Sequence, residues 1–194
     1  MAATTTTHAR TPLDAERADL IDTLAAVRGA MTATVAGVSD AQAGERPTVS
    51  ALCLGGLIKH VTAVEEMWSR FMVEGASAMP FDLPAGVTWA DIAAGTAREL
   101  PRWMTEREDE FRMLPGETVA GVVKRYEEVA ARTDEAIASV PDLSATHALP
   151  DVPWQEPGEV RSARRVIAHI IAETAQHAGH ADILRETLDG RTGS

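Results

Sequence analysis

The stretch Arg164–Asp189 most constrains the fold, because it has the periodicity of a helix but carries polar side chains on its inward face. At about 100° per residue, four of these side chains fall within an arc of about 80° that they share with apolar residues. They are His169, Glu173, His177 and His180. Burying imidazoles and a carboxylate is costly unless the groups are paired or bind a metal. The remainder of the chain is therefore expected to provide partners for this face.

Three other stretches also place apolar residues at helical spacing, and none of the chain alternates as a half-buried strand does. The four predicted helices cover residues 12–35, 50–74, 119–139 and 160–188. Ser50 is expected to cap the start of the second helix, and Gly190 fits the position after the last one. Four long amphipathic helices joined by two long connections predict an all-α four-helix bundle.

A long insert, residues 75–115, separates the second and third predicted helices. Thr88 and Asp91 have the spacing of a capping box, which predicts a helix start, and Pro101 interrupts that helix. The charged segment that follows Pro101 is expected to be exposed. We expect the insert to line or cover a pocket. This expectation would be wrong if the insert lay far from His60.

The start of the second predicted helix contains two adjacent glycines, Gly55 and Gly56. Each costs roughly 1 kcal/mol in helix propensity, so their presence predicts the close approach of a neighbouring segment. Cys53 lies just before them in an apolar run and is expected to be a buried, inert thiol, not a nucleophile.

The length and composition favour a globular cytoplasmic protein. We expect one domain over residues 12–190, after a flexible tail at residues 1–11. The net charge of −11 disfavours nucleic acid as a partner, and no apolar run is long enough to span a membrane. There is no secretory signal pattern, and a single cysteine fits a reducing cytosol. Arginine and alanine usage suggests a GC-rich genome, such as that of an actinobacterium.

Glu173 and His177 are candidate metal ligands. Their i, i+4 spacing places them on one helical face, about 6 Å apart at the backbone, so that both could bind one divalent ion. A catalytic zinc site needs a third protein ligand and an open position, and His60 on another apolar helix is the obvious candidate. The alternative is that Glu173 and His177 pair with an arginine or with each other.

Two blocks of the sequence resemble the DinB/YfiT-like superfamily of metalloenzymes. They are LGGLIKH at residues 54–60 and HIIAETAQHAGHADILRETLDG at residues 169–190, and DVPW at residues 151–154 adds to the likeness. The resemblance implies a metal held by His60, Glu173 and His177. Many members have histidine where this chain has Glu173, whereas mycothiol-dependent maleylpyruvate isomerase, which this chain also resembles, has glutamate there. Two histidines and a glutamate suit zinc, with iron, manganese and cobalt also open.

The resemblance further implies a metal-dependent S-transferase that conjugates mycothiol to an electrophilic small molecule through a metal-bound thiolate. His180 or His169 could shuttle the proton or hydrogen-bond a ligand, or could be ordinary core or solvent-edge histidines. A thiol-dependent isomerase, a metal-dependent hydrolase and a non-catalytic, stress-associated or small-molecule-binding bundle with a structural metal are the alternatives. The resemblance also implies that the chain could form a homodimer.

The remaining polar and aromatic positions give weaker expectations. Arg164 could bind an anionic substrate at the mouth of the bundle, or belong to a solvated face. Trp154 could line a pocket, as could Trp68, for which core packing is the default. Asp182 and Arg185 are expected to form a surface pair or a helix-end contact. Two acidic pairs are expected on solvated helix faces, namely Glu65-Glu66 and Glu127-Glu128.

Overall fold

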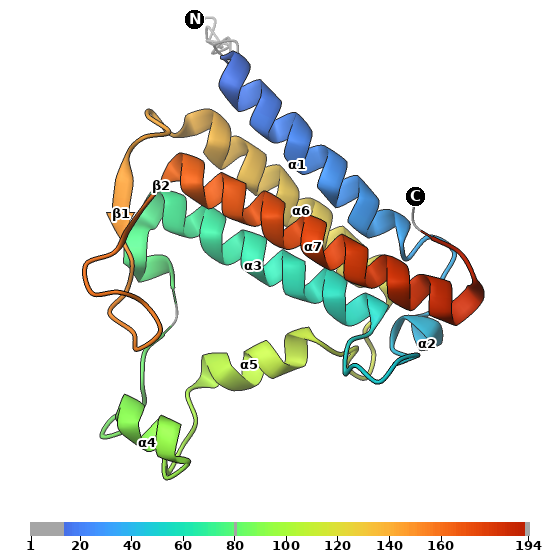
Figure 1. Ribbon diagram of the computed structural model, residues 1–194, viewed down its shortest axis with the longest axis horizontal. Coiled ribbons are helices and arrows are strands. Elements are labelled where there is room, and N and C mark those ends of the chain that lie inside the picture. Colours follow the sequence, from blue (N-terminus) through green and yellow to red (C-terminus); the bar gives the residue numbers. More distant parts are fainter. Residues whose placement is uncertain (1–13, 80, 193–194) are drawn as a thin grey trace, which may run out of the picture.

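The computed structural model describes residues 14–79 and 81–192 of the chain. Four long helices form its body: α1 (Ala15–Ala33), α3 (Leu54–Glu74), α6 (Val119–Ser139) and α7 (Ala163–Asp189). α1 and α3 each pack against both α6 and α7, so the four helices form a closed bundle (Figure 1). The predicted all-α four-helix bundle is confirmed. The predicted tail at residues 1–11 lies outside the described residues.

The helix ends show how far local sequence determines the boundaries. Gly190 follows α7 in the left-handed conformation that glycine favours, as predicted, and Thr118 caps α6. The predicted start of the second helix at Ser50 is wrong. Cys53 is the N-cap residue of α3, and its Sγ accepts a hydrogen bond from the Gly56 amide. A short helix that was not predicted, α2 (Asp40–Ala43), lies between α1 and α3.

Two short strands depart from the expectation that the chain contains none. β1 (Thr146–Ala148) and β2 (Val160–Ser162) pair antiparallel, with His147 opposite Arg161. Each has only three residues, too few to show the alternation by which a strand is recognised. The start of the last helix at Val160 is therefore also wrong, because β2 occupies that position and Ser162 caps α7. The strands hold the two ends of a connection that carries Trp154.

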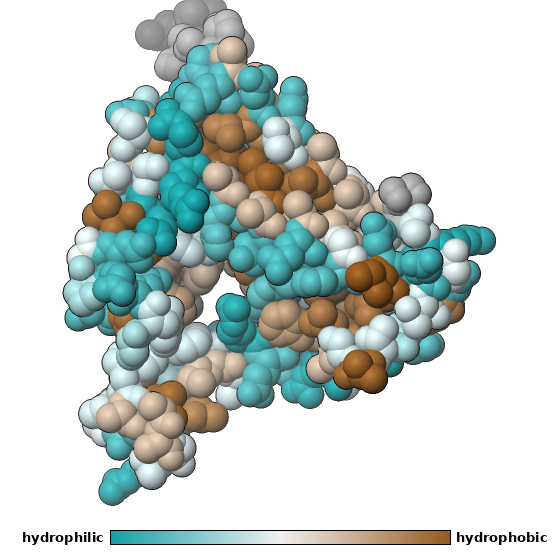
Figure 2. All heavy atoms as spheres, viewed as in Figure 1, coloured by the Kyte–Doolittle hydropathy of each residue, from teal (hydrophilic) through white to brown (hydrophobic). Residues whose placement is uncertain are grey.

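The insert contains the 3₁₀ helix η1 (Gly75–Ala78) and two α-helices, α4 (Trp89–Ala94) and α5 (Arg102–Glu110). The predicted capping box at the start of α4 is confirmed. α5 packs against α3, while α4 projects away from the bundle (Figure 1). Figure 2 shows an opening between this insert and the bundle.

The two glycines of α3 let the end of the insert approach its backbone, as predicted. A Cβ at Gly56 would lie 2.4 Å from the Phe111 carbonyl, and one at Gly55 would lie 2.3 Å from Met113 Sδ. Lys59 fastens the same segment, because its Nζ donates to the carbonyls of Asp109 and Arg112, each at 2.9 Å. The insert is thereby held against the first turns of α3.

The bundle core contains two apolar clusters and a set of buried polar side chains. One cluster includes Leu24, Phe71 and Ile170, and the other includes Met31 and Leu57. The prediction that Glu65 faces solvent is wrong. Its side chain is fully buried and accepts two hydrogen bonds from Arg28 of α1.

Arg28 and Glu65 have charged or polar neighbours within the bundle. Arg28 also bonds Asp134 of α6 at 2.9 Å, so one guanidinium links three helices. The other members of the two predicted acidic pairs lie at the surface: Glu66 binds two arginines of α6, and Glu127 and Glu128 are exposed. No helix among the described residues is long and apolar enough to cross a membrane.

Candidate metal centre

The facing helices α3 and α7 bring together the three predicted ligands. His60 lies in the second turn of α3, and Glu173 and His177 lie on successive turns of α7. Each residue offers one nitrogen or oxygen atom, and these three atoms all lie within 4.8 Å of one another. Residues separated by more than a hundred positions thus form one compact group of donors.

The His60 ring is held from two sides by the insert. Its Nδ1 donates a hydrogen bond to the Glu110 carboxylate at 2.9 Å, and the Phe111 ring stacks on it at 4.3 Å between centroids. The His60 side chain is only 3% exposed. Because Nδ1 is engaged by Glu110, Nε2 is the atom left to bind a metal, and the carboxylate fixes the tautomer that this requires.

The Glu173 carboxylate lies between two imidazoles that do not hydrogen-bond it. His177 Nε2 is 3.7 Å from Oε2, and His169 Nε2 is 4.0 Å from Oε1. Both distances exceed hydrogen-bonding range, although each falls within the range of an ion pair. Within the part of the chain that the structure describes, no arginine pairs with Glu173. Its oxygens are therefore open to a further positive partner.

His180 and His169 occupy different sides of the three donors. His180 Nδ1 lies 3.3 Å from His177 Nδ1, the ring nitrogen remote from Glu173, so it contacts the back of a candidate ligand. His169 packs edge-on against Trp68, with ring centroids 4.7 Å apart. The structure therefore places both near the centre, His180 behind His177 and His169 beside Glu173.

Burial lowers the pKa of His177 below the ordinary histidine value. The neighbouring His60, His180 and Arg107 lower it further, while the Glu173 carboxylate acts in the opposite direction. Burial is also the main cause that lowers the pKa of His169. Both imidazoles are accordingly neutral at physiological pH, which is the form that binds a metal or accepts a proton.

The donors fit a divalent transition metal by their chemistry. Two neutral imidazoles and a carboxylate form a common ligand set for zinc, and a three-residue set leaves a position for an exchangeable ligand. Ligand atoms about 2.1 Å from a tetrahedral zinc are roughly 3.4 Å apart. The three donors, which lie within 4.8 Å of one another, would therefore have to approach by up to about 1.4 Å to bind such an ion. The Glu110 carboxylate behind His60 is the partner that metal-bound histidines usually have.

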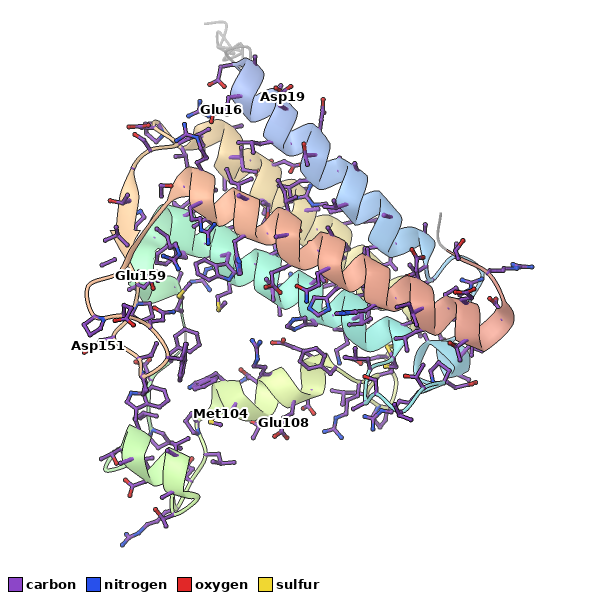
Figure 3. All side chains as sticks on the ribbon, in the orientation of Figure 1. Glu16, Asp19, Met104, Glu108, Asp151 and Glu159 are labelled. Atoms are coloured by element: carbon purple, nitrogen blue, oxygen red, sulfur yellow. The ribbon has the colours of Figure 1, made fainter. Side chains whose placement is uncertain are left out.

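Two predicted ligand-binding residues lie in different surroundings. Arg164 pairs with Glu16, with Nε and Oε1 2.5 Å apart, at the N-terminal end of α1. Figure 3 shows Glu16 at that end of the bundle, far from Met104 and Glu108 on α5. Trp154 is half-exposed and lines a pocket together with Glu173.

Arg185 forms the predicted helix-end contact, but not a pair at the surface. It is buried, and its guanidinium donates to the carbonyls of Thr34 and Ala36 just after α1 and to the Asp189 carboxylate. The expectation that charged residues lie at the surface therefore fails for Arg185, as it does for Glu65.

Three residues at the centre were not recognised from the sequence, and all belong to the insert. Glu110 and Phe111 contact His60, and Arg107 lines the same pocket as Glu173. They lie in a segment expected to be simply charged and exposed. The available signal was the glycine pair of α3, which predicted a close neighbour without identifying it.

The protein is thus a four-helix bundle with a candidate metal centre, formed by two histidines and a glutamate on two facing helices. Residues 19–190 match the family model of the mycothiol-S-transferases, and the chain belongs to this family. The resemblance to the DinB/YfiT-like superfamily is thereby confirmed.

A solved structure supports the fold. The crystal structure titled as the conserved protein of locus from Enterococcus faecalis superimposes with a TM-score of 0.59 at 14% identity. The match covers 93% of this chain and 100% of that one. No curated protein matches the chain significantly.

Proposed function

We propose that the protein is a metal-dependent S-transferase that joins mycothiol to an electrophilic small molecule. The observation that carries this proposal is the group of three donors, all within 4.8 Å of one another, on two helices that face each other. Membership of the mycothiol-S-transferase family supports the thiol substrate and the transfer reaction. The pocket beside Glu173 supports a second, small-molecule substrate.

His60, Glu173 and His177 would hold the ion. A divalent ion bound there acts as a Lewis acid and favours the thiolate form of a coordinating thiol. Glu110 and Phe111 keep the His60 ring in one orientation, since one accepts its Nδ1–H and the other stacks on its face. His180 restrains the His177 ring from behind.

His169 is the proposed proton acceptor. Its Nε2 lies 4.0 Å from Glu173 Oε1, and burial keeps its pKa low, so the ring is neutral and able to take the proton that the thiol loses. The thiol sulfur then forms a bond with the electrophilic carbon. Where that carbon carries a leaving group, the group departs with the bonding electron pair.

The number of donors favours a catalytic site over a structural one. Structural zinc sites are closed by four protein ligands. The residue best placed to be a fourth, His180, contacts the opposite nitrogen of His177 instead of joining the group of three. An open position is what a thiol substrate requires.

The test is the metal content of the purified, untagged protein by elemental analysis. We expect about one transition ion per chain, its loss in His177→Ala and its retention in the matched control His147→Gln. His147 lies in β1 and packs edge-on against Phe71, apart from the three donors. Mycothiol conjugation should follow the metal. A wild-type protein that takes up no metal even after reconstitution would refute the proposal.

A further inference from the structure

The pocket beside the candidate metal centre is unusually aromatic. It has a volume of about 490 Å³ and is lined by side chains from α3, α5, α7 and the connections on either side of them. The same elements surround the opening in Figure 2. Trp68, Trp103 and Trp154 line it, and Trp89 packs against the last two. All four tryptophans of the chain therefore lie on or against this one pocket.

The aromatic rings come from segments distant in sequence and meet edge to face. Phe81 lies 5.2 Å from Trp103 and 5.5 Å from Trp154, with interplanar angles of 79° and 89°. Such rings present flat faces and edges that favour contact with another flat π-system. Trp154 remains 54% exposed, although a tryptophan gains most by burial. A planar ligand would cover it.

Two residues of the pocket lining each have a buried polar atom without a hydrogen-bond partner. Trp103 Nε1 and Gln155 Oε1 are inaccessible to solvent, and neither is hydrogen-bonded within the described residues. Buried polar atoms are nearly always paired, so an orphaned donor and acceptor in one pocket call for a reason. A polar substituent on a bound ring would reach these atoms only if the two side chains turned towards the pocket.

One cation, Arg107, completes the lining. The arginines on either side of it in and after α5 are paired, Arg102 with Glu106 and Arg112 with Asp109. Across residues 14–79 and 81–192, no carboxylate lies within ion-pairing distance of Arg107. It is close enough to the metal centre for its charge to act on His177. An unpaired guanidinium at the edge of an aromatic pocket is suited to a carboxylate.

We propose that this pocket binds the electrophilic substrate, and that the substrate is a planar aromatic molecule that bears a carboxylate. The ring lies among Phe81, Trp103 and Trp154, the carboxylate binds Arg107, and the reacting carbon points towards Glu173. That the ligand is a substrate rests on the proposed function. The binding of an aromatic carboxylate in this pocket does not depend on catalysis. Its test can therefore be made without thiol or metal.

The binding experiment compares two non-reactive probes, para-nitrobenzoate and para-nitrobenzamide. They have the same ring, and only the first is charged. Nitroaromatic ligands quench tryptophan fluorescence, so all four tryptophans report on occupancy. We expect the benzoate to bind roughly tenfold more tightly than the amide. Arg107→Gln should abolish that difference, while Arg102→Gln, which removes the same charge from the same helix, should keep it.

A second experiment separates the ligand class from the reaction. Wild-type, metal-loaded protein is given mycothiol with a chlorodinitrobenzoate or the corresponding benzamide. Attack forms a bond between sulfur and the ring carbon that holds chlorine, chloride leaves with the bonding pair, and the thiol proton passes to His169. We expect faster conjugation of the benzoate, with the difference in KM.

The outcomes distinguish the two proposals. Selective binding of the benzoate without conjugation supports the pocket assignment and refutes the transferase. Conjugation without any preference for the carboxylate, or equal quenching by both probes in wild type and Arg107→Gln, overturns the pocket assignment and leaves the transferase standing. Failure of both probes to quench also overturns it.

Discussion

Replacing Glu110 by Gln removes a negative charge beside His60 while keeping an oxygen that can accept the Nδ1–H hydrogen bond. The contact is 2.9 Å long, with His60 3% and Glu110 21% exposed, so solvent screens it little. Loss of such a partner of a metal-bound histidine typically costs about 10- to 100-fold in metal affinity. Because Gln preserves the orientation of the ring, we expect about tenfold, or about 1.4 kcal/mol.

Replacing Glu110 by Ala removes both the charge and the acceptor, and we expect a loss of about a hundredfold. The assay is competition for zinc between the protein and a chromophoric chelator at neutral pH. Glu108→Gln is the matched control, because Glu108 is an exposed residue of the same helix (Figure 3) and the change in net charge is identical. Equal zinc affinities for Glu110→Gln and Glu108→Gln would show that Glu110 does not support the metal site.

Three further predictions concern the bundle itself. Gly56→Ala should destabilise the fold by about 1–3 kcal/mol, because the added Cβ would clash with the backbone that follows α5. The Cβ added by Gly29→Ala has no neighbour, so that substitution should stabilise α1. Equal urea unfolding midpoints for the two variants would contradict this. Arg28→Met should lower the free energy of unfolding by about 3–5 kcal/mol, because it leaves the Glu65 carboxylate buried without its counter-ion. The double variant Arg28→Met with Glu65→Leu should recover most of this loss. A loss below about 1 kcal/mol in the single variant would argue against a buried ion pair. Burial raises the pKa of Tyr126 far above 10, so above pH 10 wild-type stability should fall relative to Tyr126→Phe by about 1.4 kcal/mol per pH unit; parallel stability curves in guanidinium across alkaline pH would rule this out.

The insert connects these observations, because it contributes to both the ligand environment and the pocket. Its last turn holds His60 through Glu110 and Phe111, and its earlier part supplies Trp103 and Arg107 to the pocket wall. A change in the insert is therefore expected to affect metal affinity and substrate preference separately, depending on which of these contacts it removes.

Local physical chemistry was sufficient to predict the four long helices and the two candidate ligands on α7. Helical periodicity depends on side chains within one or two turns, and the cap at Thr88 depends on a neighbour three residues away. The pairing of Glu173 with His177 follows from the same short spacing. The third candidate ligand, His60, required the further assumption that two inward faces meet.

Tertiary structure alone decided which polar residues are buried and what the insert contacts. Arg28 and Glu65 are charged residues on amphipathic helices, and only the packing of α1 on its neighbours makes them a buried pair. Likewise, no spacing within the sequence relates Glu110 to His60 or gathers four tryptophans around one pocket. Such contacts form between surfaces remote in sequence, and their partners are set by packing geometry, whereas periodicity reports only the face on which each residue lies.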